Sequence, residues 1–507
     1  MVASTAAEAA FSASTGVTGR TPACALAIFG ASGDLTARKL LPALGRLAAD
    51  GALAPEVTLI GVARTALTDE EFRSRCRRAV QASGPGVDRL IAGARYVAGG
   101  YDDPATYVAL EQLIAELDQH RGTGGNRVYY LATPPQLFGS IAVHLGGAGL
   151  DKSPTGGFVR LVIEKPFGWD EQSARELYAE ISSVFVEEQI FRIDHYLAKE
   201  TVQNLLAVRF ANAIFEPIWN RTWVDNVQIT VAESIGVEDR GGFYETAGAM
   251  RDIVQNHVLQ VLSLFLMEPP TSFHSEAIRD EKLKLLRAIR PFAGEQDIAR
   301  RAVRGQYARG GTREDPMPGY REEPGVDPVS SVETFVALRL DIDNWRWAGV
   351  PVYVRTGKRL PQRITEVAIE FQRPPQLPLF PGSDPEPDAL LLRVAPSEGL
   401  SIRFGAKVPG RSFDVRKASM DFAYAEGFPH GAADAYERVI FDALLGDPTL
   451  FIRADEVGRS WRIVDPIIEY WAASTEPIPL YQAGTWGPRE AKNLIAADGR
   501  RSRHSGS

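Results

Sequence analysis

The sequence predicts two domains, an α/β domain with a doubly wound parallel sheet followed by a larger α+β domain with a mainly antiparallel sheet. Three observations support this fold class. Buried apolar strands alternate with helical stretches from about residue 23 to residue 193, a glycine turn follows the first strand, and beyond Val224 the strands alternate polar and apolar residues. A chain of 507 residues is also too long for one ordinary hydrophobic core.

The first domain contains four strands that read as near-continuous apolar runs, which is typical of parallel strands covered on both faces. These strands are Ala25 to Phe29, Val57 to Val62, Val128 to Ala132 and Phe158 to Ile163. After the first strand, Leu40, Leu44 and Leu47 form an apolar stripe at helical spacing. Pro42 predicts a kink in that helix.

The second domain opens with a strand in which Val227, Ile229 and Val231 alternate with polar residues, as in half-buried antiparallel strands. Further strand candidates are Phe335 to Leu340, Val352 to Val354 and Val367 to Phe371. We expect helices on one face of this sheet. Residues 307–331 are dense in Gly, Pro and charge, which predicts a long surface loop.

The same patterns set the predicted domain boundaries. We assign residues 23–193 to the first domain and residues 194–490 to the second. Residues 1–22 are rich in Ala, Ser and Thr and lack the features of a secretory signal, so we expect a disordered tail, with a transit peptide as the alternative. Residues 491–507 are polar and predict a flexible tail.

The composition limits the possible classes of function. A chain that is 45% hydrophobic and 24% charged is typical of a soluble globular protein, and no apolar run is long enough to span a membrane. The net charge of −8 argues against nucleic acid as the main partner, because phosphate backbones are held by basic surfaces. Only Cys24 and Cys76 are present, which favours a reducing, cytoplasmic location. The histidines show no metal-ligand spacing, so we expect no metal.

A glycine turn between Gly30 and Leu35 follows the first strand. Gly30 permits a tight turn, and Gly33 lets backbone N–H groups approach a phosphate at the start of the next helix. The turn departs from the GxGxxG pattern because Ser32 stands at the second glycine position and Leu35 at the last. It favours a Rossmann-like dinucleotide-binding domain, and an ordinary glycine turn is the alternative.

Arg64 follows the second strand and bears on the choice of dinucleotide. Folds that prefer NAD tend to place an acidic residue at this strand end, where it holds the ribose 2'-hydroxyl. A cation suits a 2'-phosphate instead. Arg64 therefore favours NADP, and a solvated surface arginine is the alternative.

Asp194, His195 and Lys199 lie where one domain pattern gives way to the other, which is a common position for a ligand cleft. If a helix begins here, His195 and Lys199 lie at i and i+4 on the same helical face. Two cations so placed suit a phosphate monoester. In the alternative, Asp194 only caps a helix and Lys199 points into solvent.

His257 lies on a helical stretch with Val254 at helical spacing, and it is expected to point inward. An inward histidine is often a plain core residue. Asp194, Glu233 and Asp252 are candidate carboxylates that would orient it as a general base near neutral pH.

Cations also follow two of the strands. Lys165 stands at the C-terminal end of a buried strand, where open α/β sheets bind ligands. Arg355 and Lys358 follow the strand that begins at Val352, and Arg363 comes a few residues later. Each lysine taken alone fits a surface charge better than a ligand contact.

Taken together, these segments closely resemble the signature segments of the glucose-6-phosphate dehydrogenase family, in the family's order. The segments are Ile28 to Leu35, Glu164 to Gly168, Arg192 to Glu200, Arg251 to His257 and Arg355 to Lys358. The resemblance runs from about Ala25 to Tyr481. It implies oxidation of D-glucose 6-phosphate at C1 to 6-phospho-D-glucono-1,5-lactone, with hydride transfer to NADP, by a homodimer or homotetramer.

The resemblance also implies roles for single residues. His257 would remove the proton from the C1 hydroxyl, with Asp194 as its carboxylate partner. The residues expected at the sugar phosphate are His195, Tyr196 and Lys199, and those around the sugar are Lys165, Glu233, Asp252, Lys358 and Arg363. The residues expected at the cofactor are Gly30, Ser32, Gly33, Asp34, Leu35, Arg64 and Lys165. The chain departs from the family's usual residues at Thr36, Ala198 and Phe138, the last standing where some members have a cofactor-contacting Tyr.

Two other functions remain open at the level of the sequence. Another two-domain NADP-dependent sugar oxidoreductase would also place a lysine like Lys165 in its site, but it would not require the pair His195 and Lys199. A catalytically silent NADP-sensing protein would keep only the dinucleotide site. The absorbance of NADPH after mixing with glucose 6-phosphate and NADP distinguishes these functions.

Overall fold

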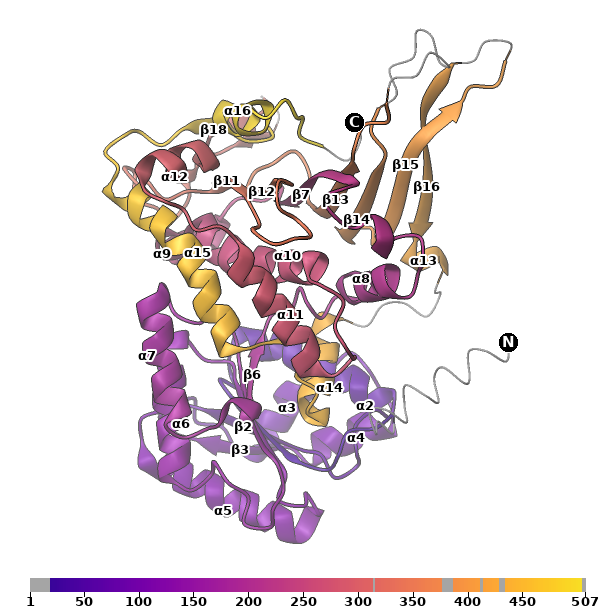
Figure 1. The fold of residues 1–507 in the computed structure, drawn as a ribbon. Helices are drawn as coiled ribbons and strands as arrows, with labels where there is room; N and C mark the ends of the chain where they lie inside the picture. Colours follow the sequence, from indigo (N-terminus) through magenta and orange to yellow (C-terminus); the bar gives the residue numbers. More distant parts are fainter. Residues whose placement is uncertain (1–18, 313–314, 376–385, 411–413, 428–433, 504–507) are drawn as a thin grey trace. The chain divides into compact units, whose positions relative to one another are not determined.

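The computed structural model describes residues 19–312, 315–375, 386–410, 414–427 and 434–503, which form two compact units (Figure 1). The first unit runs up to Ala198 and regains Phe273–Arg279 and Ala433–Ala454. The second contains Lys199–Ser272, Asp280–Ala432 and Asp455–Ser507. The first unit therefore extends slightly beyond the predicted boundary at residue 193. Two later segments also belong to the first unit, so no single boundary in the sequence separates the two units.

The first unit is built on a seven-stranded sheet in the order β17-β6-β5-β4-β1-β2-β3. Its strands are β1 Ala25–Phe29, β2 Thr58–Ala63, β3 Arg95–Ala98, β4 Arg127–Leu131, β5 Val159–Ile163, β6 Ile190–Ile193 and β17 Phe451–Ile452. All pairings are parallel except that of β17 with β6. The four predicted strands are confirmed, whereas β3 was not specified because it is a short, partly exposed edge strand.

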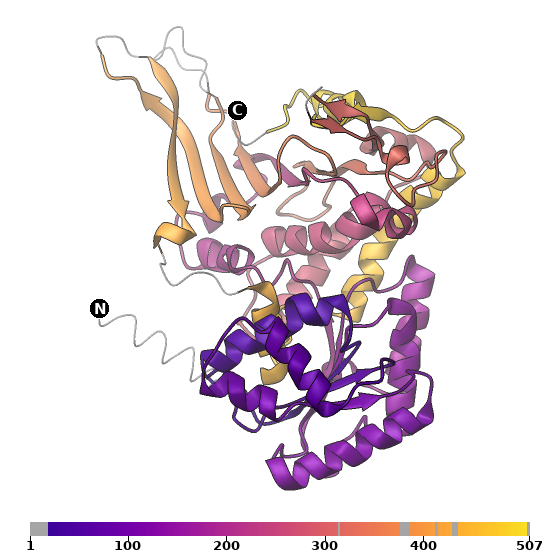
Figure 2. The same ribbon diagram turned by 180° about the vertical axis from the view of Figure 1, so that it is seen from behind.

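Helices cover both faces of this sheet, as expected for a doubly wound fold (Figures 1 and 2). On one face lie α2 Leu41–Ala49, α3 Asp69–Ala79, α4 Pro85–Ala92 and α14 Ala435–Leu445, and on the other α5 Pro104–Arg121, α6 Phe138–Gly147 and α7 Glu171–Ser182. The predicted stripe of Leu40, Leu44 and Leu47 is buried. The predicted kink is a change from the π-helix η1 Thr36–Leu40 to α2, and Pro42 lies at this change, in the first turn of α2.

The second unit is built on a nine-stranded sheet in the order β16-β15-β14-β13-β7-β12-β11-β8-β18. Its strands are β7 Val224–Ala232, β8 Ala302–Ala308, β11 Phe335–Leu340, β12 Val352–Gly357, β13 Ile364–Phe371, β14 Ala389–Ala395, β15 Gly399–Lys407, β16 Val415–Ala423 and β18 Leu480–Gln482. Only the pairs β7 with β12 and β8 with β18 are parallel. The prediction of a mainly antiparallel sheet is confirmed.

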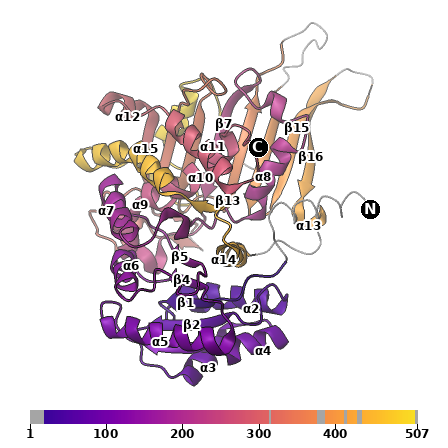
Figure 3. The same ribbon diagram turned by 60° about the horizontal axis from the view of Figure 1, so that its bottom comes forward.

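Helices of the second unit include α8 and α10, which lie against one face of this sheet (Figure 3). Besides α14, the longer helices beyond residue 198 are α8 Glu200–Phe210, α9 Gly241–Ala249, η6 Met250–Val258, α10 Leu259–Leu266, α11 Ser275–Ala288, α12 Glu295–Arg301, α13 Tyr424–Gly427, α15 Ala454–Ala473 and α16 Arg489–Ala496. The expected surface loop after Tyr307 is anchored by Tyr320, which is fully buried and packs edge-on against Tyr307. The loop also contains the short strands β9 Gly310–Gly311 and β10 Pro316–Met317.

The described C-terminal residues bind to the sheet of the second unit, so the expected flexible tail from residue 491 is wrong for them. Gln228 of β7 donates to the Arg501 carbonyl (3.0 Å) and accepts from the Arg503 N–H (2.8 Å). Arg500 forms two hydrogen bonds with the carboxylate of Asp225. These contacts also explain why β7 is buried along most of its length, although its alternating sequence predicts one exposed face.

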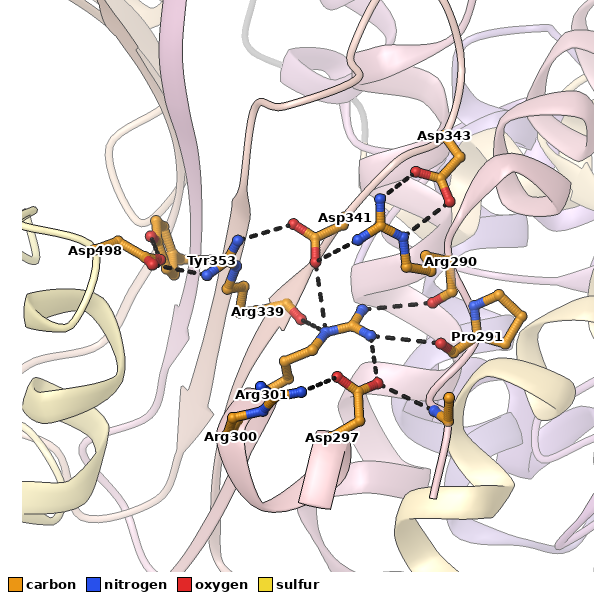
Figure 4. A network of polar contacts seen from close by, with 11 residues as sticks. Arg290, Pro291, Asp297, Arg300, Arg301, Arg339, Asp341, Asp343, Tyr353 and Asp498 are labelled. Atoms are coloured by element: carbon orange, nitrogen blue, oxygen red, sulfur yellow. Dashed lines mark hydrogen bonds and ion pairs between the residues drawn. The ribbon is translucent and has the colours of Figure 1, made fainter. Parts of the chain in front are cut away.

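A network of charged side chains holds the end of α16 on the same sheet (Figure 4). Arg339 of β11 donates to the Asp498 carboxylate at 2.7 Å, and Tyr353 of β12 donates to the same group. Arg339 also contacts Asp341, whose carboxylate lies 3.6 Å from Arg301 at the end of α12. Because the carboxylates are shared, this network stabilises the segment more than isolated surface ion pairs would. The polar residues of this C-terminal segment therefore bind polar groups of the sheet instead of water.

The N-terminal part of the fold begins before residue 23. Thr21 is buried and its N–H donates to the Ala52 carbonyl at 2.8 Å, while residues 1–18 of the predicted tail lie outside the described residues. Cys24 and Cys76 are both buried and unbonded to each other, and burial raises the pKa of each thiol to about 12. Among the described residues, no helix combines the length and the apolar character that a membrane span requires.

Candidate active site

The glycine turn lies at the point where the strand order of the first sheet reverses. β1 pairs with β2 on one side and with β4 on the other, and ligands of doubly wound sheets bind at such switch points. Gly30 has a φ of 88°, and a Cβ at this position would lie 2.3 Å from the Ala132 carbonyl oxygen. Only glycine fits this turn. Its carbonyl accepts from the Gly33 N–H (2.9 Å) and the Thr36 hydroxyl (3.0 Å), which fixes the turn.

Polar and charged side chains surround the turn. Ser32 accepts from the hydroxyl of Thr65, which follows β2, at 3.1 Å. Arg64 is exposed at the end of β2, with its guanidinium 5.9 Å from the centre of the Tyr101 ring. The N–H groups of Gly30 and Ala31 donate to the Val62 carbonyl, and that of Gly33 donates to the Gly30 carbonyl, so these three donors are used within the protein. Arg64 places a cation at the same edge of the sheet.

The helix after the turn carries the other predicted cofactor residues. Asp34 forms an exposed ion pair with Arg38 at 2.7 Å, and Leu35 precedes η1. Phe138 is fully buried at the start of α6, so its side chain fills the core rather than the cofactor site.

Glu164 follows β5 directly and is buried, and Lys165 is the next residue in the chain. Tyr130 of β4 donates its hydroxyl hydrogen bond to Glu164 Oε1 at 2.6 Å. Burial raises the pKa of Glu164 to about 7 and the Asp194 charge acts in the same direction, whereas Tyr130, Lys165 and the hydroxyl of Tyr436 oppose the shift. The lysine at the end of β5 thus stands beside a carboxyl group that ionises near neutral pH.

Asp194 and Tyr196 lie in a turn after β6, and no helix begins there. One oxygen of the buried Asp194 carboxylate accepts from the Tyr196 N–H at 2.8 Å, which closes the turn. Helix α8 starts only at Glu200, with Lys199 as its N-cap residue. The suggested i and i+4 spacing of His195 and Lys199 on one helical face is therefore wrong, because the aspartate competes for the backbone donors that a helix would need.

His195 packs against the ring of Tyr436, a residue that no sequence motif marks. Its ring lies parallel to that of Tyr436, with centroids 6.4 Å apart and 12° between the planes. Tyr436 stands in the first turn of α14, and Lys39 lies 5.9 Å above its ring. The segment beginning at Asp434 carries a capping box, with Glu437 at its third position, which could have marked this helix start in the sequence.

His257 and Asp252 lie on the π-helix η6, and His257 is 1% exposed. The predicted inward direction of His257 is confirmed, but the helix is wider than the α-helix that its spacing suggested. Gly248, near the end of α9, has a φ of 61° and interrupts the helical backbone just before η6, and the Met250 N–H donates to Glu333 at 3.0 Å. Short π-helical stretches occur often at functional sites.

Glu233 and Lys358 form an ion pair in the second unit. Glu233 follows β7 and Lys358 follows β12, and these parallel neighbours bring their C-terminal ends together. The Lys358 ammonium lies 5.1 Å from the centre of the Tyr244 ring, and the Tyr481 hydroxyl donates to the Lys358 carbonyl at 2.6 Å. Burial, with the charges of Asp252 and Glu233, raises the pKa of Tyr244 well above its usual value.

The predicted site residues thus belong to two units. The first unit carries Lys165, Asp194, His195 and Tyr196, and the second carries Lys199, Glu233, Asp252, His257, Lys358 and Arg363. Arg363 is exposed in the turn before β13. The sequence did not single out Tyr130, Tyr244 and Tyr436, which are buried or half-buried and belong to no motif. Glu164 was named only as the first residue of the segment Glu164 to Gly168, without a role of its own.

A glycine turn at the switch point of a doubly wound sheet, joined to an α+β unit rich in inward titratable groups, defines a two-domain dinucleotide-binding oxidoreductase. Residues 27–204 match the family model "Glucose-6-phosphate dehydrogenase, NAD binding domain", and residues 206–503 match "Glucose-6-phosphate dehydrogenase, C-terminal domain". The chain belongs to the glucose-6-phosphate dehydrogenase family. It is an oxidoreductase and its cofactor is NADP.

Similar proteins cover nearly the full chain. The glucose-6-phosphate 1-dehydrogenase of Aggregatibacter actinomycetemcomitans is 48% identical over 481 residues, covering 94% of this chain and 96% of that protein. A solved glucose-6-phosphate dehydrogenase in complex with its substrate glucose-6-phosphate has a TM-score of 0.87 at 34% identity, covering 96% of this chain and 100% of that one. The glucose-6-phosphate 1-dehydrogenase from Mycobacterium avium has a TM-score of 0.80 at 36% identity, with 95% and 99% covered. The predicted fold class and family are confirmed.

Proposed function

We propose that the chain oxidises D-glucose 6-phosphate at C1 to 6-phospho-D-glucono-1,5-lactone, with hydride transfer to NADP. This reaction is the entry step of the oxidative pentose phosphate pathway. The observation that carries the proposal is the near full-length similarity to glucose-6-phosphate 1-dehydrogenases of several bacteria at 43–48% identity. The predicted site residues stand at the strand ends and on the π-helix of a fold that suits this chemistry.

In this proposal His257 accepts the proton of the C1 hydroxyl, and Asp194 orients its imidazole and stabilises the imidazolium that forms. Removal of the proton develops negative charge on the C1 oxygen and drives the hydride away from C1. NADP, when bound, supplies the nicotinamide carbon that accepts the hydride. The burial of His257 excludes water from the proton acceptor.

The remaining site residues hold the substrate and the cofactor in this proposal. The substrate phosphate is bound by His195, Tyr196 and Lys199, and the sugar by Lys165, Glu233, Asp252, Lys358 and Arg363. The ion pair of Glu233 with Lys358 keeps both charged groups in place near a polar ligand. The cofactor is bound by Gly30, Ser32, Gly33, Asp34, Leu35, Arg64 and Lys165.

The direct test is the absorbance of NADPH after the purified chain is mixed with glucose 6-phosphate and NADP. We expect rapid NADPH formation with glucose 6-phosphate and very little with free glucose at the same concentration, because free glucose lacks the phosphate that Lys199 binds. Equal rates with both sugars would indicate another sugar oxidoreductase. NADP binding without turnover would indicate a silent NADP-binding protein.

The role of Arg64 predicts a change in cofactor preference. Arg64→Ala should weaken NADP binding by about 1.5 to 3 kcal/mol, because one charge-assisted hydrogen bond to the 2'-phosphate is lost. NAD binding should change little. Dissociation constants for both cofactors, measured by fluorescence titration, check this. Arg78→Ala, which removes another exposed arginine from the same unit, serves as the control. An equal loss for NAD and NADP would place Arg64 away from the 2'-phosphate.

We also assign the chain to a homodimer or homotetramer in the cytoplasm. Support for self-association comes from β16, the edge strand of the nine-stranded sheet, which exposes Met420 and Phe422 on one face. The buried, reduced Cys24 and Cys76 suit a reducing compartment. Sedimentation of the purified chain would separate monomer, dimer and tetramer.

A further inference from the structure

The buried carboxyl group of Glu164 lies between two tyrosine hydroxyls and beside the lysine proposed to contact both substrate and cofactor. Glu164 is the first residue after β5, and the hydroxyl of Tyr130, on the neighbouring strand β4, donates to its Oε1 at 2.6 Å. Tyr436 of α14 forms a second hydrogen bond with Glu164. Two hydroxyl donors on one buried carboxyl group form a built polar site rather than a chance contact.

Helix α14 holds its tyrosine firmly in this place although it comes late in the chain. Arg46 of α2 forms an ion pair with Glu437 near the start of α14. At the other end, Arg160 of β5 donates to the carbonyls of Ala443 (2.9 Å) and Leu444 (2.6 Å). The helix is thus fixed at both ends to the first unit, which gives Tyr436 a defined position over Glu164.

The groups that face Glu164 come from every element packed against it. Lys165 follows it in the chain, Tyr130 lies on β4, Tyr436 lies on α14, and Asp194 follows β6. The tyrosine hydroxyls can both donate to a carboxylate, whereas protonation of the carboxyl group turns one acceptor site into a donor. These hydrogen bonds therefore favour the ionised form and oppose the effect of burial, which favours the protonated form. The ionised form also supplies a negative charge next to the Lys165 ammonium.

We propose that Glu164 is a positioning residue that, when ionised, holds Lys165 in its working orientation, and that Tyr130 and Tyr436 set the pH at which this happens. The inference rests on the proposed function of Lys165. Glu164 acts through Lys165 and not on the substrate itself. Since its pKa lies at about 7, activity should depend on its ionisation in the physiological range.

The kinetic test compares the acidic limb of the pH profile of kcat/KM between the natural chain and its variants. Tyr130→Phe removes one donor from the carboxylate, which raises the pKa of Glu164, and the acid limb should move to higher pH by about one pH unit. Glu164→Gln keeps the size and one acceptor but removes the charge, so kcat/KM at pH 8 should fall about 10-fold or more. The double variant Glu164→Gln, Tyr130→Phe should show no further shift, because the titrating group is gone.

A neighbouring tyrosine provides a matched control. Tyr129 lies next to Tyr130 on β4, is also buried, and donates its hydroxyl hydrogen bond to the Leu150 carbonyl at 3.0 Å. Tyr129→Phe should lower the melting temperature as much as Tyr130→Phe does, yet it should leave the acid limb in place. An acid limb that moves equally in both variants, or in neither, overturns the proposal.

Thermal unfolding tests the ionisation without any activity measurement. The pKa of Glu164 is raised from 4.5 to about 7 in the folded chain, so its protonation contributes stability that is fully present below pH 4.5 and is lost as the pH rises through 7. Glu164→Gln lacks this loss. Its melting temperature relative to the natural chain should therefore rise by about 5 °C between pH 5 and pH 8.

The outcomes separate the inference from the proposed function. A constant difference in melting temperature between pH 5 and pH 8 overturns the inference even when the enzyme oxidises glucose 6-phosphate. A natural chain that is inactive with glucose 6-phosphate overturns the proposed function, and with it the role of Glu164 in catalysis, whatever the melting temperatures show.

Discussion

His257→Asn is expected to lower kcat by about 10² to 10⁴ while the KM for glucose 6-phosphate changes little, because the proton acceptor is removed and the binding groups remain. Asparagine keeps a polar side chain of similar reach at the buried position on η6. The part of the acidic limb that the titrating histidine imposes on the pH profile should disappear as well, which leaves only the part expected from Glu164. Steady-state kinetics from pH 5.5 to 9, with NADP binding measured as a check on folding, would show this.

Two further variants sharpen the test of His257. Asp194→Asn should lower kcat less, since the imidazole stays but loses its orientation and the charge that stabilises the imidazolium. His144→Asn changes a half-buried histidine of α6 that packs on Tyr107, and it should leave kcat unchanged. A well-folded His257→Asn chain with near-normal kcat would mean that another group accepts the proton.

Strand ends were predictable from the sequence because they combine two local signals. The buried apolar runs give the strand, and the first polar residue after each run gives the side chain at the C-terminal edge of the sheet. Arg64 after β2 and Glu233 after β7 follow this rule, and after β5 it points to Glu164, next to Lys165. The ligand edge of each sheet could therefore be assigned without long-range information.

The backbone conformation of residues 194–199 could not be predicted from local sequence signals. The periodicity there fits a helix, and the turn forms because the Asp194 carboxylate accepts a backbone N–H that an α-helix would use. The π-helix η6 has a related cause, since Gly248 breaks the preceding helix and the Glu333 side chain accepts the Met250 N–H where the next helix starts. Neither contact leaves a periodic signal in the sequence.

Contacts between distant segments account for the rest. Tyr436 reaches Glu164 because α14 returns to the first unit late in the chain, and no pattern near Glu164 reveals its arrival. The C-terminal arginines were read as a solvated tail, yet Arg500 and Arg503 bind carboxylates of β7 and β13. The charge of an arginine alone does not predict whether it binds water or a carboxylate.

Lys199→Ala is expected to raise the KM for glucose 6-phosphate on the order of 100-fold or more, because the ammonium is proposed to bind the substrate phosphate with charge-assisted hydrogen bonds. Lys199 is the N-cap residue of α8, and its carbonyl accepts from the Val202 N–H at 2.9 Å, which fixes its backbone. The first turn of α8 adds the positive end of the helix dipole to the ammonium charge. Initial rates over a wide range of substrate concentration would measure the change.

Two control variants and a second substrate show whether the rise in KM reflects loss of the phosphate contact. Lys199→Arg keeps the charge and should recover much of the affinity, and Lys284→Ala, which removes an exposed lysine paired with Glu281, should change nothing. Activity with free glucose at high concentration should be nearly the same in Lys199→Ala as in the natural chain, since free glucose has no phosphate that Lys199 could bind. An equal loss with both sugars would show that Lys199 supports the fold or the chemistry at C1, and the phosphate site would then have to be built from other cations.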